Sequence, residues 1–442
     1  MTDRPPVEIP GIPLAASPSS GLVSVIMANR NGELYLERAM RSVLDQTHRQ
    51  IELIVSDDGS TDGSRAIIRR LAEEDSRVRL IESPVGTGPG AARNRAIAQA
   101  AGDWIAICDS DDILHPERLE RLLKSAVALG ADLIADDLIY FGEDPLERHM
   151  TLLQSLDLQA PQEIDALALI TCRLLGQSDL SFGYLKPMIR SSALRTIRYN
   201  EELRVDEDYD LYLRLLIAGH KFMVIPDGLY LYRRHPKSTS HRASTASLER
   251  MVKVQTDFLK TLPPGSETLA QAISARTRSH LRELRYTRLL DALKQKKWLL
   301  AIGRLIRHPQ NVFSLWKSLS ERFRRQQLNQ SLVRGHLNLV LCAKGRAAES
   351  ETPGFTTFEV PEYAEVPWSP SAAPVWAKLS QLACENDLHL LAVDRAGAFA
   401  LGLVPEYASA ELRVPQPSTR ILAPEAEGST IVMSTRKVQG GP

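Results

Sequence analysis

The sequence contains few cysteines and few aromatic residues, and it carries no net charge. Its 442 residues include four cysteines that lie far apart and never form a CxxC pattern. A disulfide framework or a cysteine-based metal site is therefore not expected, and the cysteines fit the reducing cytosol as packing residues. No apolar segment approaches the roughly 20 residues that a membrane-spanning helix needs. The first 20 residues lack the basic-then-apolar pattern of a secretory signal, so we expect a cytoplasmic protein.

The absence of a net charge conceals an uneven distribution of charge. The chain has 54 Lys and Arg residues and 54 Asp and Glu residues, yet residues 276–325 alone contain fourteen basic and three acidic ones. This segment has a net charge of +11, and its cations alternate with Leu, Ile and Trp residues. A basic amphipathic helix of this kind can lie on an anionic membrane surface. The competing interpretation is a pair of helices that covers the rest of the protein, with solvated Lys and Arg side chains.

Outside this segment the net charge is −11, so the neutral total is a cancellation. The local excess of cations favours the membrane interpretation, which predicts a peripheral protein on the inner face of the cytoplasmic membrane. Nucleic acid is another common partner of concentrated positive charge. No nucleic-acid recognition module is found in the sequence, so nucleic acid is not expected as a partner.

Residues 21–245 show short apolar runs that alternate with helical periodicity. This alternation predicts an α/β fold with a doubly wound, mostly parallel sheet that is covered on both faces. Ligands of such sheets bind outside the carboxyl ends of the strands, so the polar residues that follow each strand are the candidates for function. The predicted strands are 22–27, 51–56, 78–82 and 104–108, and the predicted helices are 33–44, 63–74, 90–101 and 116–129.

The rest of the chain differs from this α/β region in composition. Residues 1–20 are rich in Pro and Ser and are expected to form a disordered leader. Residues 246–335 are expected to form a basic helical region. Residues 336–442 form a C-terminal extension of unknown role, in which ten prolines follow residue 345. The elements expected here are helices at 247–262, 267–293 and 296–323 with a break at Pro309, a short helix at 375–385, and a hairpin of 388–393 with 398–404.

The acidic motif Asp109-Ser110-Asp111-Asp112 directly follows the predicted strand 104–108. Three carboxylates in four residues repel one another unless a cation or hydrogen-bond donors share the site. At the carboxyl end of a strand they can hold a divalent cation whose shell is completed by water and phosphate oxygens. The alternative is a turn that caps the helix beginning at Pro116, although a single carboxylate suffices for a cap.

Two further motifs follow the second strand and open the third helix. Asp57 lies nearest the strand end in the motif 57–62, where its carboxylate could accept a hydrogen bond from a nucleobase. Asp62 or a neighbouring residue is expected to cap the next helix. The glycine-rich motif 86–90 opens a helix that contains Arg93. It continues neither as a Walker loop nor as GxGxxG. It suits the approach of a base or diphosphate to a guanidinium, although a simple glycine turn is the better interpretation of this motif alone.

Two charged motifs lie further along the chain. The acidic run 205–210 heads a helical stretch, so it either supplies a general base or simply complements the helix dipole. The segment 230–240 combines aromatic residues, cations and His235. It is either a solvated basic loop or a lid that clamps a diphosphate, and the residue types favour the lid.

Together these motifs resemble the family 2 glycosyltransferases over about residues 22–242, and the resemblance implies the GT-A fold. Two segments, 183–188 and 232–240, are similar to the bacterial exopolysaccharide-assembly transferases of the succinoglycan type. Residues 336–442 lie outside the resemblance. The matching motifs, in chain order, are 27–32, 57–62, Ala92-Arg93-Asn94, 109–112, Glu207-Asp208 and 233–240.

The resemblance implies a role for individual residues. Asp208 would be the catalytic base, with Glu207 as its neighbour. Asp57 would contact the uracil ring, and Arg93 would bind the same nucleotide. A divalent cation, Mn²⁺ or Mg²⁺, would be held by Asp109, Asp111 and His235. The residues implied in binding the nucleotide-sugar are Ala28, Asn29, Arg30, Asp57, Arg93, Asp109, Asp112, Arg233 and Arg234.

These roles imply a metal-dependent inverting transferase that moves a hexose from a UDP-sugar to a saccharide acceptor in exopolysaccharide or cell-envelope polysaccharide biosynthesis. The acceptor is expected to be linked to a polyprenyl diphosphate. Displacing the nucleoside diphosphate builds negative charge that a divalent ion neutralises. The acceptor hydroxyl loses its proton to a positioned carboxylate. Nothing marks a second carboxylate beneath the sugar, so a single displacement with inversion is expected.

Two alternative functions are less well supported by the sequence. A sugar nucleotidyltransferase should carry a glycine-rich loop with Arg and Lys after its first strand, and residues 28–32 do not form one. A catalytically inactive, transferase-like scaffold should have lost acidic residues, and every expected acid is present. Titration with UDP, with and without Mn²⁺, separates the scaffold from an enzyme.

Overall fold

The computed structural model describes most of the first 312 residues and short segments beyond them. The predicted leader 1–20, the predicted helix 375–385, the predicted strand 398–404 and residues 236–240 lie outside the described residues. The described residues are 21–142, 151–156, 158–172, 181–235, 243–312, 315–316, 320, 335–343, 356–360, 386–392 and 431–434.

The main sheet has nine strands and is mixed but mostly parallel, as predicted. Its order is β3-β2-β1-β4-β8-β6-β9-β5, with β7 beside β9. Strands β3, β2, β1 and β4 are parallel, β8 runs antiparallel between β4 and β6, and β9 is parallel to β6. The strands are β1 (Val23–Asn29), β2 (Ile51–Asp58), β3 (Val78–Ser83), β4 (Trp104–Ile107), β5 (Ile113–Leu114), β6 (Leu133–Gly142), β7 (Gln162–Ile164), β8 (Met188–Arg190) and β9 (Phe222–Arg234).

The first half of the sheet follows the predicted alternation, with small differences at the strand ends. β1 and β2 run two residues further than predicted, because Asn29 pairs with Asp57 in the parallel ladder. The helices pack by apolar stripes, as in α1, where the side chains at i, i+3 and i+4 are buried. The helices of this region are α1 (Leu36–Leu44), α2 (Ser64–Glu74), α3 (Pro89–Gln99), α4 (Arg118–Leu129), α5 (Ala166–Thr171) and α6 (Glu207–Ile217), with 3₁₀ turns at Gln154–Leu156 and Phe182–Tyr184.

The aspartates 109–112 do not cap the helix that follows them. Helix α4 begins at Arg118 rather than at Pro116, and its N-cap residue Glu117 makes no side-chain capping hydrogen bond. The capping alternative is therefore wrong. The N-cap residue of α2 is Gly63, without a side-chain capping hydrogen bond, so the predicted side-chain cap is not formed. Asp62 instead precedes the cap and accepts a hydrogen bond from the amide of Ser64.

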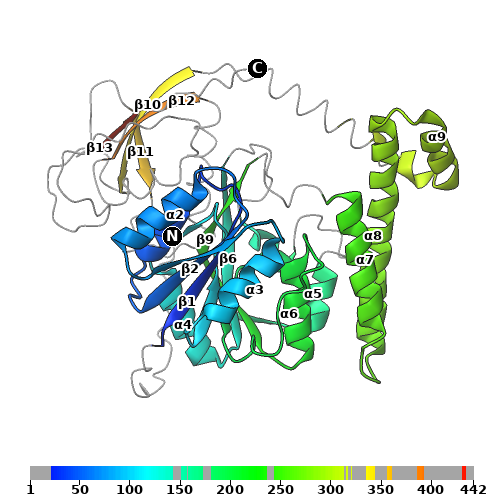
Figure 1. The fold of residues 1–442 in the computed structure, drawn as a ribbon, viewed down its shortest axis with the longest axis horizontal. Coiled ribbons are helices and arrows are strands. Elements are labelled where there is room, and N and C mark those ends of the chain that lie inside the picture. The colour runs from blue at the N-terminus through cyan, green and yellow to red at the C-terminus, as the bar shows by residue number, and fades with distance from the viewer. Residues whose placement is uncertain are drawn as a thin grey trace, which may run out of the picture.

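Three helices form an arm beside α5 and α6 (Figure 1). They are α7 (Thr245–Leu259), α8 (Glu267–Lys294) and α9 (Trp298–Arg307). Figure 1 shows α7 and α8 side by side, with α9 at one end of α8. Helix α9 ends before Pro309, in agreement with the predicted break, since Pro cannot continue a helix ladder. None of the helices in the described part of the chain is long and apolar enough to cross a membrane.

A second sheet follows in the C-terminal extension. It has four strands in the order β11-β10-β12-β13, where β11 and β12 are parallel to β10 and β13 is antiparallel to β12. β12 corresponds to the predicted strand 388–393, whereas the other three strands were not predicted. Their bounds are β10 (Gly335–Ala343), β11 (Thr356–Val360), β12 (Asn386–Ala392) and β13 (Ile431–Ser434).

Candidate active site

The carboxyl ends of β1 and β2 place Asn29 beside Asp57. The Asn29 side-chain amide donates to Asp57 Oδ2 at 3.1 Å, and Arg65 Nε donates to Asp57 Oδ1 at 2.7 Å. Burial disfavours the ionised form of Asp57, but hydrogen bonds from Ser60, Arg65 and Asn29 outweigh it and lower the pKa of this carboxyl. Asp57 is therefore a fixed, ionised acceptor at the end of the strand where nucleotides are expected to bind.

The adjacent carboxylate, Asp58, organises the glycine-rich loop, a role that sequence reasoning missed. Its oxygens accept hydrogen bonds from the amides of Thr87 and Gly88 at 2.9 and 2.7 Å, and from Arg95 Nη2 at 2.8 Å. Gly88 has φ of +109°, a conformation that favours glycine. A Cβ at Gly86 would collide with the guanidinium of Arg30, so the predicted binding residue Arg30 packs directly on this loop. The loop is thus a fixed surface beside Asp57.

The three aspartates of the acidic motif have different environments. Asp112 is 1% exposed, and its oxygens accept from the Arg233 amide and the Tyr230 hydroxyl, each at 2.7 Å. Burial, together with the charges of Asp111 and Asp109, raises the pKa of Asp112 well above its ordinary value. Asp111 is more accessible than Asp112, with about a third of its side chain exposed. Asp112 therefore joins the motif to β9, while Asp111 faces outward.

Asp109 binds two cations, one on each oxygen. Arg93 Nη2 lies 2.7 Å from Oδ1, and Lys186 Nζ lies 2.9 Å from Oδ2. Burial raises the pKa of the Asp109 carboxyl, but the charges of Lys186 and Arg93 outweigh this effect and hold it below the ordinary range. To bind a metal ion as well, Asp109 would need a spare lone pair on an oxygen that already faces a cation.

The same two cations bind the carboxylates at the start of α6. Lys186 Nζ lies 2.7 Å from Asp208 Oδ2, and Arg93 Nη1 lies 2.9 Å from Glu207 Oε1. Burial disfavours the charged form of Lys186, but Asp109 and Asp208 outweigh it and raise the pKa of the ammonium well above its ordinary value. The Tyr199 hydroxyl donates to Asp208 Oδ1 at 3.0 Å. Residues from four distant parts of the chain therefore form one buried charge network.

Lys186 is the functional residue of this network to which sequence reasoning gave no role. It lies in the segment 183–188, just before β8, and β8 lies between β4 and β6. Its main-chain carbonyl accepts a hydrogen bond from Arg118, whose guanidinium is fully buried and paired with Asp136 at 2.7 Å. The sequence marks Lys186 only by its place in the segment 183–188. Its contact with Asp109 depends on the order of the strands, which no local pattern specifies.

The end of β9 closes the site over the acidic motif. His235 Nε2 lies 3.0 Å from Asp111 Oδ2, and Arg233 Nε donates to the Asp111 carbonyl at 2.7 Å. The Arg233 guanidinium also lies 4.5 Å from the Tyr35 ring centroid, and Arg234 lies 5.5 Å from that of Tyr140. Arg233 and His235 thus meet Asp111 directly, while Arg234 points to β6.

Asp111 and His235 form the pair that fits a divalent cation best. Carboxylate oxygen and imidazole nitrogen are suitable ligands for Mn²⁺ or Mg²⁺, and such ions are commonly bound by one or two side chains together with substrate phosphates and water. No group of three or more His, Cys, Asp or Glu side chains able to hold a metal occurs in the described residues. In such a shell, substrate phosphates and water would supply further ligands.

The structure corrects one part of the charge interpretation. Arg276, the first cation of the segment 276–325, is 2% exposed and bonds both oxygens of Asp206 at 2.9 and 2.7 Å. It therefore cannot contact a membrane. Its burial arises from a tertiary partner on α6, which the helical periodicity of the segment does not reveal.

Comparisons with known proteins agree with the motifs. Residues 24–186 match the model of the family described as glycosyl transferase family 2. The chain is 31% identical over 306 residues to the succinoglycan biosynthesis protein ExoO of Rhizobium meliloti. The aligned region covers 69% of this chain and 86% of ExoO. It is 32% identical over 306 residues to ExoU of the same organism, over 67% of this chain and 85% of ExoU.

Among solved structures, residues 1–349 of S. aureus TarS in complex with UDP-GlcNAc superpose with a TM-score of 0.50. The identity is 19%, over 64% of this chain and 79% of that one, so the likeness concerns the fold. The sequence resemblance and the predicted fold are both confirmed. The chain belongs to glycosyltransferase family 2 and has the GT-A fold.

Proposed function

We propose that this glycosyltransferase moves a hexose from a UDP-sugar to a saccharide acceptor during assembly of an exopolysaccharide or another cell-envelope polysaccharide. The observation that carries the proposal is the charge network in which Lys186 joins Asp109, at the carboxyl edge of the sheet, to Asp208 on α6. In this arrangement Asp208 would be the carboxylate that deprotonates the acceptor, beside the predicted donor site. The biosynthetic setting is supported by the similarity to ExoO and ExoU, which are succinoglycan biosynthesis proteins.

The donor would lie along the carboxyl ends of β1, β2 and β4. Asp57 would accept a hydrogen bond from the uracil N–H, because its carboxylate is held ionised at the end of β2. Ala28, Asn29 and Arg30 would line the nucleotide side. Arg93 and Asp109 would lie nearer the ribose and diphosphate, and Asp112 would shape the donor-sugar side from beneath, since it is buried.

Asp111 and His235 would hold a Mn²⁺ or Mg²⁺ ion, with Arg233 and Arg234 beside the diphosphate. Bound there, such an ion supplies positive charge that stabilises the leaving nucleoside diphosphate. The Arg233 guanidinium, already fixed over Tyr35, adds a second positive charge at the same edge. Asp109 is the weaker candidate for a metal ligand, because both of its oxygens already face cations.

Asp208 would accept the proton of the acceptor hydroxyl as it attacks the anomeric carbon. The Tyr199 hydroxyl and the Lys186 ammonium fix the two oxygens of this carboxylate. Glu207 bonds to Arg93, so it would orient that guanidinium rather than take the proton. A single displacement of this kind inverts the anomeric centre, so an α-linked donor gives a β-linked product.

Helix α9 would bind the protein to an anionic membrane surface, where a polyprenyl-diphosphate-linked acceptor would reside. Its apolar side chains are exposed, with Trp298 at 61%, Leu299 at 88% and Ile306 at 77%. Lys296, Lys297 and Arg307 add exposed cations around them. Apolar and basic side chains together are typical of helices that lie in a bilayer interface. The protein would then be peripheral on the inner face of the cytoplasmic membrane.

A panel of UDP-sugars tests this proposal. UDP release is measured for each sugar with Mn²⁺, with Mg²⁺ and with a chelator, in the presence of lipid-linked saccharide acceptors. We expect one UDP-hexose to dominate and the chelator to abolish release. The inactive-scaffold hypothesis predicts no turnover with any donor. Calorimetric titration with UDP in the same buffers measures binding separately from turnover. Equal turnover with GDP-sugars would contradict the UDP assignment.

A further inference from the structure

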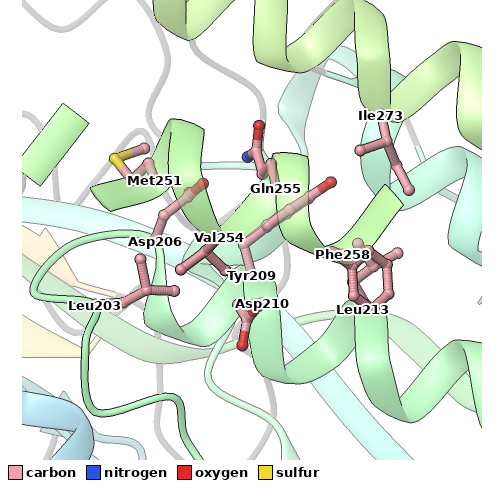
Figure 2. A pocket seen from close by; sticks show the side chains of 10 residues that line it. All are labelled: Leu203, Asp206, Tyr209, Asp210, Leu213, Met251, Val254, Gln255, Phe258 and Ile273. Carbon is pink, nitrogen blue, oxygen red and sulfur yellow. The ribbon is translucent and has the colours of Figure 1, made fainter. Parts of the chain in front are cut away.

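The guanidinium of Arg276 is buried between α8 and the first turn of α6. Its Nη2 atom donates to both oxygens of Asp206, at 2.9 and 2.7 Å, and its Cζ atom lies 3.7 Å from the ring centroid of Tyr209. Figure 2 shows a neighbouring pocket that Asp206 and Tyr209 line together with Ile273, which lies one turn before Arg276 on α8. The arm of helices thus reaches the residues that begin α6.

Asp206 has an unusual conformation directly before the two functional carboxylates. Its φ is +69°, in the left-handed region that a non-glycine residue seldom adopts. Asp is a favourable N-cap residue because its side chain normally accepts a hydrogen bond from the first turn. Here that side chain makes no capping hydrogen bond. Its carboxylate bonds to Arg276, so a tertiary contact fixes the residue from which Glu207 and Asp208 follow.

We propose that Arg276 is a positioning residue for Glu207 and Asp208, and that it acts through Asp206. The inference rests on the proposed role of Asp208 as the base. Arg276 holds Asp206 in its left-handed conformation, and this conformation sets the direction in which α6 begins. The direction of the first turn decides whether Asp208 reaches Lys186 and Tyr199, and a small misplacement of a catalytic group is costly in rate.

A contribution to the stability of the fold does not by itself account for the buried ion pair of Arg276 and Asp206. The Nε and Nη1 atoms of Arg276 have no hydrogen-bond partner among the described residues, although the side chain is 2% exposed. Burying such groups without partners costs free energy, and a buried ion pair contributes little net stability. What the ion pair does provide is a fixed geometry, because Nη2 bonds both oxygens of Asp206 and the guanidinium stacks on the Tyr209 ring, which restricts the side chains involved.

The arrangement also joins the proposed membrane contact to the active site. Helix α8 carries Arg276, and α9, with its exposed apolar face, follows directly after it. The exposed apolar face of α9 and Arg276 therefore lie on two successive helices of the same arm, which contact each other.

Steady-state kinetics of the full-length protein test the inference. With the UDP-sugar that the wild type uses fastest, we expect Arg276→Met to lower kcat by about tenfold or more. The KM for the donor and the calorimetric Kd for UDP should stay within about threefold, because the β1, β2 and β4 edge is unchanged. Arg276→Lys, which keeps the charge but loses the planar guanidinium that stacks on Tyr209, should recover part of the lost kcat.

A double-mutant cycle tests whether Arg276 acts on Glu207 and Asp208 through Asp206. Asp206→Asn removes the paired charge with little change in shape, and we expect the double variant with Arg276→Met to be no slower than the slower single variant. The control is Arg250→Met, an exposed arginine on α7, which should match the wild type. Circular dichroism verifies that each variant is folded. If Arg276→Met fails to fold, Asp206→Asn carries the same prediction alone.

The outcomes separate this inference from the proposed function. A folded Arg276→Met variant with wild-type kcat would overturn it, as would fully additive effects of Arg276→Met and Asp206→Asn. Asp208→Asn is measured in the same assay. If Asp208→Asn is inactive while Arg276→Met is unimpaired, the inference fails and the proposed base stands. If Asp208→Asn is fully active, the base assignment fails and the inference fails with it.

Discussion

The ammonium of Lys186 lies 2.7 Å from the carboxylate of Asp208, and both groups are buried. Removing the ammonium leaves Asp208 without its closest cation and also releases one oxygen of Asp109. Truncating one partner of a buried charge pair is more disruptive than its net contribution suggests, because the other charge stays buried. Lys186 is thus the residue on which both halves of the site depend.

We expect Lys186→Met to reduce kcat by about 100-fold and to weaken donor binding as well, because Asp109 loses its partner. Turnover of UDP-sugar and calorimetric binding of UDP measure the two effects. Lys124→Met, which removes an exposed lysine of α4, is the matched control. Wild-type turnover in Lys186→Met would show that the bridge between Asp109 and Asp208 has no part in the reaction.

The proposed metal ligands Asp111 and His235 give a second prediction. Asp111→Asn and His235→Gln should each weaken the activation of UDP release by Mn²⁺, by about tenfold or more in the half-maximal Mn²⁺ concentration. Binding of UDP without metal should change little, because neither side chain lies at the β2 end where Asp57 is held. Glu73→Gln, a substitution on the outer face of α2, is the control. Unchanged Mn²⁺ activation in both variants would place the metal elsewhere.

Asp137 predicts a pH dependence of stability. It is fully buried in β6, and its Oδ1 atom accepts hydrogen bonds from the amides of Leu138 and Leu153 at 2.7 and 2.8 Å. Burial raises the pKa of Asp137 to about 7. The folded protein therefore keeps this proton up to about pH 7, whereas an unfolded Asp releases it near about pH 4.

The sign follows from this difference in proton binding. Between about pH 4 and about pH 7 the folded state binds more protons than the unfolded state, so the free energy of unfolding falls as the pH rises. Asp137→Asn, a neutral analogue, should remove this slope, and its stability relative to the wild type should increase toward pH 7. Urea unfolding of both proteins across this range measures it. A constant difference between them at every pH would refute the assignment.

Helix α9 predicts binding to anionic vesicles. Leu299→Glu combined with Ile306→Glu should weaken binding to phosphatidylglycerol-containing vesicles by about tenfold or more, because each substitution replaces an exposed apolar side chain by an acid. Binding by the wild type should also fall with added salt. Val127→Glu removes an exposed apolar side chain of α4 and serves as the control. Equal binding to vesicles of phosphatidylcholine alone would argue against a charge-assisted contact.

The sequence predicted the features that depend on local pattern. The apolar runs located β1 to β4, and the rule that ligands bind at strand ends directed attention to Asp57 and Asp109. The motifs also identified the family. The position of Asp111 next to His235 followed from the family resemblance, and the structure places these two side chains 3.0 Å apart.

The features that sequence reasoning missed depend on contacts between distant segments. Lys186 reaches Asp109 because β8 runs antiparallel between β4 and β6, and no local pattern specifies that order. Asp112 resembles its neighbours in the sequence, yet the pairing of β5 with β9 buries it under Tyr230. Arg276 has the spacing of a surface cation, and only its contact with Asp206 shows otherwise.

The most direct test of the proposed mechanism is the turnover of the preferred UDP-sugar by Asp208→Asn, with UDP binding measured in parallel. Asp210→Asn, two residues further along α6, is the control. The mechanism predicts that Asp208→Asn loses at least about 1,000-fold in kcat while UDP binds as in the wild type, since the amide cannot accept the acceptor proton. Wild-type turnover in Asp208→Asn would contradict it.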